Sequence, residues 1–235
     1  MPSLSIVVDR VFDMQTTTLV YKKAKNRKDS LPCFARCREL FVAAEQNGGW
    51  LEQCVDTGRF LAINRELVDA LALTLRQMAG NSLILEICAG SGLLSHLLAA
   101  RNVDIQATDV KPPKGSEILR MSAQEALKRF QPSVVLGAFV PHDGGVDEAV
   151  LACPLVQHYV IINARIGGVL GSPLLWRAPA WKHEPLDKIR SWLITRHDVW
   201  LGRDNRKNGD ILQHGEAWHF TRTTLSPTAQ ERLNV

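Results

Sequence analysis

The sequence lacks an apolar run near the roughly 20 residues that a membrane-spanning helix needs, so we expect no membrane span. We also expect no secretory signal, because no basic region precedes the N-terminal apolar stretch and Asp9 interrupts that stretch. The five cysteines are odd in number and show no paired spacing, which argues against a disulfide framework and favours a reducing, cytoplasmic compartment. The seven histidines show no metal-ligand spacing with a third partner, and we predict no metal.

The composition is ordinary for a globular protein, with 46% hydrophobic and 22% charged residues. A length of 235 residues suits one domain of about 150–200 residues and an appendage. The net charge of +4 is concentrated locally in segments 21–28 and 203–209. Such basic segments indicate either a phosphate-rich partner or solvated turns, and the sequence leaves both interpretations open.

The first part of the chain predicts two β-prone segments, 5–12 and 16–23, and then two helices. Apolar residues recur at helical spacing in 31–46, and a second helical stripe begins after Asn64 and ends at Gly80. We therefore expect an N-terminal extension that would act as a lid, a core and a tail. Their expected bounds are 1–63, 64–224 and 225–235.

From residue 81 onward, strand and helix patterns alternate, which predicts a doubly wound α/β sheet. The strands are expected at 82–88, 103–109, 117–121, 132–140 and 158–165, with helices at 92–102, 123–130 and 145–156. Two further extended segments, 198–203 and 216–222, have no helix between them. We therefore expect these two segments to pair antiparallel.

The stretch LILEICAGSGLLSHLL, residues 83–98, places a carboxylate at the end of a buried strand and small residues in the turn that follows. Gly90 and Gly92 allow the backbone to approach a ligand, and ligands of open parallel sheets bind beyond the carboxyl ends of the strands. Glu86 would repel a pyrophosphate. It suits instead a ligand with a positive charge, such as an amino group or a sulfonium.

Two more positions bear on the ligand. Ser95 stands where the dinucleotide-binding fingerprint has a third small Gly or Ala. Asp109 ends the second strand, where a carboxylate can accept both hydroxyls of a ribose. Asp109 therefore indicates a nucleoside, and it suits NAD and S-adenosylmethionine equally.

The motif LEICAGSG followed by ATDV resembles motifs I and II of the class I S-adenosylmethionine-dependent methyltransferases, and the resemblance extends from about residue 60 to about residue 222. It implies a Rossmann-like fold with a mostly parallel seven-stranded sheet, helices on both faces and an antiparallel terminal strand pair. It also implies S-adenosylmethionine as the cofactor. The implied cofactor contacts are Glu86, Cys88, Ala89, Gly90, Ser91, Gly92, Asp109, Val110, Ser122, Ala123 and Phe139.

The resemblance gives each of these contacts a role. Glu86 and the backbone of residues 88–92 would surround the methionine part, and Asp109 would hold the ribose. Val110 would lie against the adenine. Where the family often has an acidic residue and Ala, this chain has Ser122 and Ala123, which would offer a hydroxyl and a backbone N–H to the adenine. Phe139 would flank the cofactor.

The acceptor of the methyl group should lie beside the ends of the fourth and fifth strands, where the chain reads FVPHDGG. The Asn or Asp, Pro-Pro and aromatic residue typical of adenine- and amide-methylating members are missing, which argues against a base exocyclic amine. His142, with a pKa near neutrality, is a candidate to take a proton, beside Asp143. The alternative is that His142 is a solvated loop residue and Asp143 a helix cap.

Four aromatic residues are candidate substrate contacts. Trp176 and Trp181 lie in a tryptophan-rich segment after the fifth strand, and Trp50 and Phe60 lie in the N-terminal extension. Stacking on a flat acceptor is one interpretation, and core packing is the other.

The leading hypothesis is O- or N-methylation of a small molecule, because no separate nucleic-acid-reading module is visible. The second is an RNA or protein methyltransferase whose basic segments dock the acceptor. The third is a NAD-dependent dehydrogenase, against which Glu86 and Ser95 argue. The fourth is a protein that binds the cofactor without methyl transfer.

Overall fold

The computed structural model describes residues 31–46, 49–56, 59–141, 144–165, 170–202 and 211–223. The two β-prone segments predicted at 5–12 and 16–23, the basic segments 21–28 and 203–209, and the tail lie outside these ranges. Within them, no helix combines the length and the apolar character needed to cross a membrane.

The described residues form a seven-stranded sheet with the order β3-β2-β1-β4-β5-β9-β6. The five strands from β3 to β5 are parallel, and β9 runs antiparallel to both of its neighbours. Their bounds are β1 Ile84–Ile87, β2 Ile105–Asp109, β3 Leu119–Arg120, β4 Val134–Ala138, β5 His158–Ala164, β6 Trp181–Pro185 and β9 Gly215–Arg222. The predicted doubly wound, mostly parallel α/β sheet with an antiparallel terminal pair is confirmed.

The partners in that antiparallel pair differ from the prediction, which was wrong in pairing 198–203 with 216–222. Segment 216–222 belongs to β9, which lies between β5 and β6. Residues Val199–Trp200 form β7 and pair instead with β8, Ile211–Leu212. Strand β9 belongs inside the sheet because Ala217 and Phe220 are fully buried on its opposite faces.

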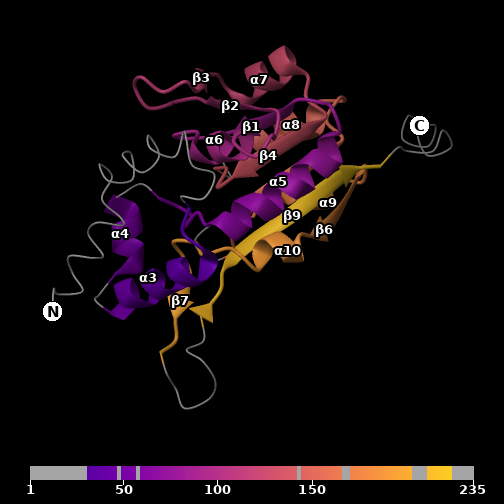
Figure 1. Ribbon diagram of the computed structural model, residues 1–235. Helices are drawn as coiled ribbons and strands as arrows, with labels where there is room; N and C mark the ends of the chain where they lie inside the picture. Colours follow the sequence, from indigo (N-terminus) through magenta and orange to yellow (C-terminus); the bar gives the residue numbers. More distant parts are fainter. Residues whose placement is uncertain are drawn as a thin grey trace.

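Helices cover both faces of the sheet. On one face lie α5, α6 and α10, and on the other lie α7, α8 and α9. Their bounds are α5 Arg65–Ala79, α6 Leu93–Ala99, α7 Ala123–Phe130, α8 Val146–Ala152, α9 Pro173–Arg177 and α10 Asp187–Arg190. Figure 1 shows α5 running along its face beside β9 and α10.

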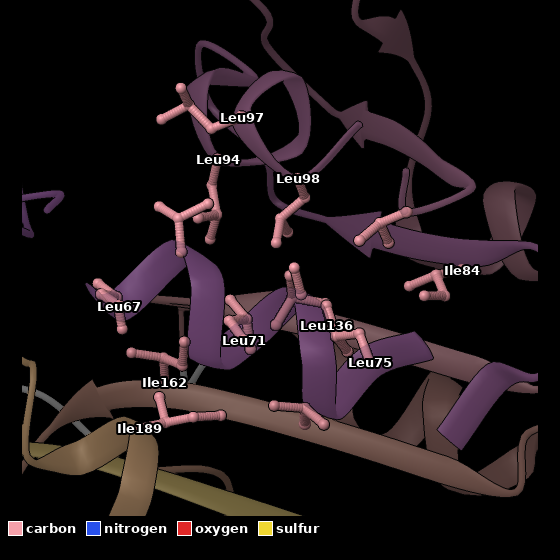
Figure 2. Close-up of a cluster of buried hydrophobic side chains, with 14 of the residues drawn as sticks. Leu67, Leu71, Leu75, Ile84, Leu94, Leu97, Leu98, Leu136, Ile162 and Ile189 are labelled. Carbon is pink, nitrogen blue, oxygen red and sulfur yellow. The ribbon is translucent and has the colours of Figure 1, made fainter. Parts of the chain in front are cut away.

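The larger core cluster lies between α5, α6 and the strands. Leu67, Leu71 and Leu75 of α5 are fully buried there. Figure 2 shows these leucines gathered with apolar side chains from α6, β1, β4, β5 and α10. Helix α5 begins as predicted, because the Asn64 side chain accepts the Leu67 N–H at 2.9 Å and so caps the first turn.

The N-terminal helices α3, Phe34–Gln46, and α4, Trp50–Asp56, pack away from the central sheet, together with β7 (Figure 1). Their core contains Phe41 and Trp50 and includes Ile194 from the segment that follows α10. The helix predicted at 31–46 is thus confirmed as α3. The proposed lid role of segment 1–63 stays a prediction.

Candidate functional site

The strand order reverses between β1 and β4, since the chain leaves β1 toward β2 and later returns to the other side of β1 as β4. Ligands of open α/β sheets bind at such a point, beyond the carboxyl ends of the strands. The β1–β4 register ends with Ile87 paired with Gly137, so the turn after β1 and the segment after β4 leave the sheet from neighbouring positions. We call this region the carboxyl edge.

The turn after β1 contains two glycines with left-handed backbone. At Gly90, with φ +55°, a Cβ atom would meet nothing within 4 Å. At Gly92, with φ +70°, a Cβ would lie 2.0 Å from Cδ1 of Ile118. The turn therefore approaches Ile118 at Gly92 and leaves open space at Gly90, beside the solvent-exposed Ser91.

Asp109, the last residue of β2, joins this turn. Its Oδ2 accepts the Gly90 N–H at 2.8 Å, and its Oδ1 accepts the Lys111 N–H at 2.7 Å. The Ala89 N–H donates to the Thr108 carbonyl at 3.0 Å and ties the same turn to β2. Asp109 is half-buried, and a carboxylate has about four lone-pair sites, so each oxygen retains acceptor capacity for a ligand.

Glu86 lies beneath the turn, with 2% of its surface exposed. Its carboxylate accepts a hydrogen bond from the Ser95 hydroxyl on α6, and its backbone carbonyl accepts one from Thr108 Oγ1 at 3.2 Å. Burial raises the pKa of Glu86 to about 7, while the Ser95 hydrogen bonds lower it and the nearby Asp109 raises it. Glu86 therefore exchanges its proton near neutral pH.

Ser95 has a role that the sequence did not reveal. We interpreted it as a departure from the dinucleotide-binding fingerprint, whereas the structure makes it the hydrogen-bond donor to Glu86. Ser95 lies on the first turn of α6, close to the end of β1. The short separation between Glu86 and Ser95 in the sequence could have suggested this contact.

Two residues other than glycine have positive φ in the left-handed region at this edge: Cys88 with φ 55° and Phe139 with φ 57°. They directly follow β1 and β4, the two strands at the reversal of strand order. Such backbone costs free energy and is concentrated at binding sites. Burial, followed by the charge of Asp109, raises the pKa of Cys88 to about 11, so its thiol stays protonated and is a poor nucleophile.

The predicted adenine contacts lie at the ends of β2 and β3. Val110 is 59% exposed, as a residue that faces a ligand would be in the free protein. The Ser122 hydroxyl, however, is engaged in a capping box with Glu125, whose backbone N–H it accepts at 3.3 Å and whose carboxylate it contacts at 2.8 Å. Ala123 is the first residue of α7, where N–H groups have no partner within the helix.

Two aromatic rings and an arginine meet at the carboxyl end of β4. The Phe139 ring lies 5.2 Å from the Phe60 ring at an interplanar angle of 37°. The Arg196 guanidinium lies 4.1 Å above the centre of Phe60. Sequence patterns do not indicate Arg196, because this contact joins segments more than a hundred residues apart.

The predicted tryptophan contacts are placed elsewhere. Trp50 is 2% exposed and donates its indole N–H to the Thr195 carbonyl at 2.8 Å. Trp176 packs edge-on against Trp218 in the core cluster on the face of the sheet that α7, α8 and α9 cover. Trp181 pairs with Arg222 at the amino end of β5, which is the opposite edge of the sheet.

The candidate catalytic residues His142 and Asp143 lie outside the described residues, and their role stays a prediction. Across the described ranges, no three His, Cys, Asp or Glu side chains gather as metal ligands would. His158 and His219 do meet, with Nδ1 and Nε2 3.0 Å apart, and His219 contacts Glu184 at 3.2 Å. This chain of hydrogen bonds lies away from the carboxyl edge, because His158 begins β5.

No family model and no curated protein matches the chain. Among solved structures, an S-adenosylmethionine-dependent O-methyltransferase from Thermotoga maritima is 9% identical, with 76% of this chain and 72% of that chain covered and a TM-score of 0.48. A 1,6-didemethyltoxoflavin N1-methyltransferase from Burkholderia thailandensis is 13% identical, with 81% and 89% covered and a TM-score of 0.43. A putative RNA methyltransferase from Pyrococcus horikoshii is 16% identical, with 81% and 98% covered and a TM-score of 0.41. Because these values are low, the proposals below rest on the geometry of this chain.

Proposed function

We propose that this protein is an S-adenosylmethionine-dependent methyltransferase that methylates an oxygen or nitrogen atom of a small-molecule acceptor. The observation that carries the proposal is the 2.8 Å hydrogen bond from the Gly90 N–H to Asp109. It brings a carboxylate that could accept ribose hydroxyls beside a turn whose Gly90 leaves open space, at the place where the strand order reverses.

The charges at this edge favour a cationic ligand over an anionic one. Glu86 is buried directly below the turn, and Asp109 lies beside it. A pyrophosphate at the turn would meet both carboxyl groups, whereas an ammonium or sulfonium group would be attracted by them. A cation near Glu86 would also lower its raised pKa and favour its ionised form.

The chain's residues would share the work of binding along the edge. Asp109 would accept the ribose hydroxyls, and Val110 would lie against the adenine. Glu86 would act through charge on the amino-acid part, because the Ser95 hydrogen bond holds its carboxylate in place. Phe139 would limit the space on the β4 side and exclude water.

When bound, S-adenosylmethionine supplies an electrophilic methyl group on a sulfonium. The protein's contribution is then to hold the acceptor in line and to remove its proton where the acceptor is a hydroxyl or a cationic amine. Cys88 does not serve as a base, because its thiol is protonated at neutral pH. The proposed base remains His142.

Calorimetry with S-adenosylhomocysteine tests the assignment of Asp109. We expect wild type to bind, and Asp109→Ala to lose about 1–3 kcal/mol of binding free energy, the scale for a charged hydrogen-bonding group. Asp104→Ala, which removes an exposed carboxylate before the same strand, should bind like wild type. Equal affinity of wild type and Asp109→Ala would remove the ribose role. Binding of NAD in place of S-adenosylhomocysteine would replace the methyltransferase proposal by the dehydrogenase alternative.

A further inference from the structure

We infer that the methyl acceptor is an aromatic compound that carries a carboxylate or phosphate group, and that Phe60 and Arg196 bind it at the carboxyl edge. This acceptor class rests on the proposed function for the reaction itself. Three features of the chain support it: the place of Phe60, the lack of an ion pair at Arg196 among the described residues, and the hydrogen bonds that hold both residues in position.

Phe60 lies beside the position that a cofactor would occupy. Its ring contacts Phe139, which directly follows β4, the strand that pairs with β1. With 39% of its surface exposed, Phe60 is one of the large apolar side chains that remain open to solvent. An exposed aromatic ring at a ligand-binding edge is suited to contact a flat, apolar part of a ligand.

Arg196 supplies a positive charge to the same place. Its guanidinium lies over the Phe60 ring, and its Nε donates to His197 Nε2 at 3.0 Å. Among the residues that the structure describes, Arg196 forms no ion pair. Burial, and then the charge of Arg196, lower the pKa of His197, while the charge of Asp198 raises it; with a lowered pKa the imidazole is neutral at neutral pH.

The terminal N–H groups of Arg196 donate to no group among the described residues, since only its Nε and backbone N–H form hydrogen bonds there. A guanidinium that lies over a ring can still donate hydrogen bonds in its own plane. Two parallel N–H groups match the two oxygens of a carboxylate or phosphate. The carboxylate of Glu45 accepts the backbone N–H groups of Trp50 at 3.3 Å and Trp200 at 3.5 Å, and it forms no ion pair with Arg196.

A network behind the two residues holds them in position. The Arg196 N–H donates to the Phe60 carbonyl at 3.0 Å, and the Ala62 N–H donates to the Ile194 carbonyl at 2.8 Å. Between these bonds, Leu61 and Thr195 form an antiparallel bridge. The segments that carry Phe60 and Arg196 are therefore joined like two short strands, which fixes one side chain relative to the other.

Asp198 anchors the segment of Arg196 from below. Its buried carboxylate accepts the Thr195 N–H at 2.9 Å, the Thr195 hydroxyl at 2.8 Å, the His214 N–H at 2.8 Å and the Gly215 N–H at 3.2 Å. Trp50 donates to the Thr195 carbonyl from the other side. So much buried hydrogen bonding is typical of a loop that positions a binding residue.

Binding of matched aromatic probes tests this assignment. Benzoate, phenyl phosphate and the neutral benzamide are titrated, by ligand-observed NMR, into the full-length protein saturated with S-adenosylhomocysteine. We expect wild type to prefer the two anions over benzamide by about tenfold or more, as charge-assisted hydrogen bonds would give. Arg196→Gln should abolish that preference, and Arg196→Lys should restore part of it. The control Lys182→Gln removes a positive charge at the opposite edge and should leave the preference unchanged.

The affinity of each variant for S-adenosylhomocysteine shows whether Arg196 binds the anionic group of the acceptor or another anion, such as the cofactor carboxylate or RNA. Unchanged affinity in Arg196→Gln, with lost anion preference, supports the acceptor site. Weaker S-adenosylhomocysteine binding with an unchanged probe preference would assign Arg196 to the cofactor carboxylate and overturn the inference. Salt-dependent tRNA binding that requires Arg196, without any preference among the probes, would overturn it in favour of RNA, as would the absence of probe binding. Failure of wild type to bind S-adenosylhomocysteine at all would instead contradict the proposed function.

Discussion

At the scale of the residue, Gly90 and Gly92 share a left-handed backbone and differ in their surroundings. Any side chain at either position costs about 1–2 kcal/mol in left-handed conformation. At Gly92 a methyl group would also collide with Ile118, whereas at Gly90 it would project into open space. Substitutions at the two positions can therefore distinguish an effect on the stability of the turn, at Gly92, from an effect on ligand binding, at Gly90.

We predict that Gly92→Ala lowers the free energy of unfolding by about 2–4 kcal/mol, the sum of backbone strain and overpacking. Gly90→Ala should cost only about 1 kcal/mol of stability but should weaken S-adenosylhomocysteine binding about tenfold or more, because the methyl group occupies the ligand's space. Chemical denaturation and calorimetry measure the two effects. Gly115→Ala, at another open left-handed glycine, serves as the control with an altered stability and unaltered binding. Normal binding by Gly90→Ala would place the ligand elsewhere.

Glu86 gives the site a dependence on pH. Because burial raises its pKa from 4.5 to about 7, the fold favours the protonated carboxyl group. Its contribution to stability is therefore complete below the unfolded pKa of 4.5 and is lost as pH rises through about 7. The shift corresponds to roughly 3 kcal/mol at most.

We predict that Glu86→Gln, which keeps an acceptor for Ser95, removes this loss. The free energy of unfolding of the variant, relative to wild type, should increase as pH rises through about 7. The affinity of wild type for S-adenosylhomocysteine, relative to the variant, should increase over the same range, because the ionised carboxylate attracts the ammonium group. Parallel pH profiles of wild type and Glu86→Gln, in denaturation and in calorimetry, would show that Glu86 does not titrate near neutrality.

At the scale of the element, the amino end of α7 shows that a residue which matches a ligand-binding pattern can instead cap a helix. The sequence pattern placed Ser122 at an adenine contact, and the structure places its hydroxyl in the capping box of α7. A hydroxyl that accepts the Glu125 N–H is directed toward the helix. The backbone N–H of Ala123 thus remains the better candidate at this position.

We predict that Ser122→Ala lowers the free energy of unfolding by about 1 kcal/mol, as the loss of an N-cap does, and leaves the affinity for S-adenosylhomocysteine within about twofold of wild type. Ser122→Asp should retain the stability, since aspartate is a good N-cap. Denaturation curves and calorimetry of the two variants decide the point. A loss of affinity without a loss of stability would instead support the predicted contact of Ser122 with the adenine.

The elements that the sequence predicted well are those with a strong local pattern. Helix α5 follows from Asn64 and three leucines at helical spacing, and β1 follows from a continuous apolar run. Strand β6 escaped prediction because Trp181 is its only buried residue, so that an exposed edge strand lacks the apolar alternation of a half-buried one. The pairing of β9 was missed because it depends on distant partners rather than on adjacent segments.

At the scale of the whole molecule, the doubly wound sheet brings together residues that lie far apart in the chain. The proximity of Glu86, Gly90 and Asp109 was predictable, since these residues lie in motifs of fixed spacing, and their role in binding stays a prediction. The pairing of Phe60 with Arg196 was not, because it depends on the N-terminal extension meeting the segment after α10. The carboxyl edge is thus bounded by parts of the extension and of the core together.

The most direct test of the central claim is a crystal structure of the protein grown with S-adenosylhomocysteine. We predict electron density for the ligand over the turn after β1, with its ribose hydroxyls on Asp109 and its amino-acid part on the side of Glu86. Density for a dinucleotide in that position, or for S-adenosylhomocysteine away from the carboxyl ends of β1 and β2, would contradict the account.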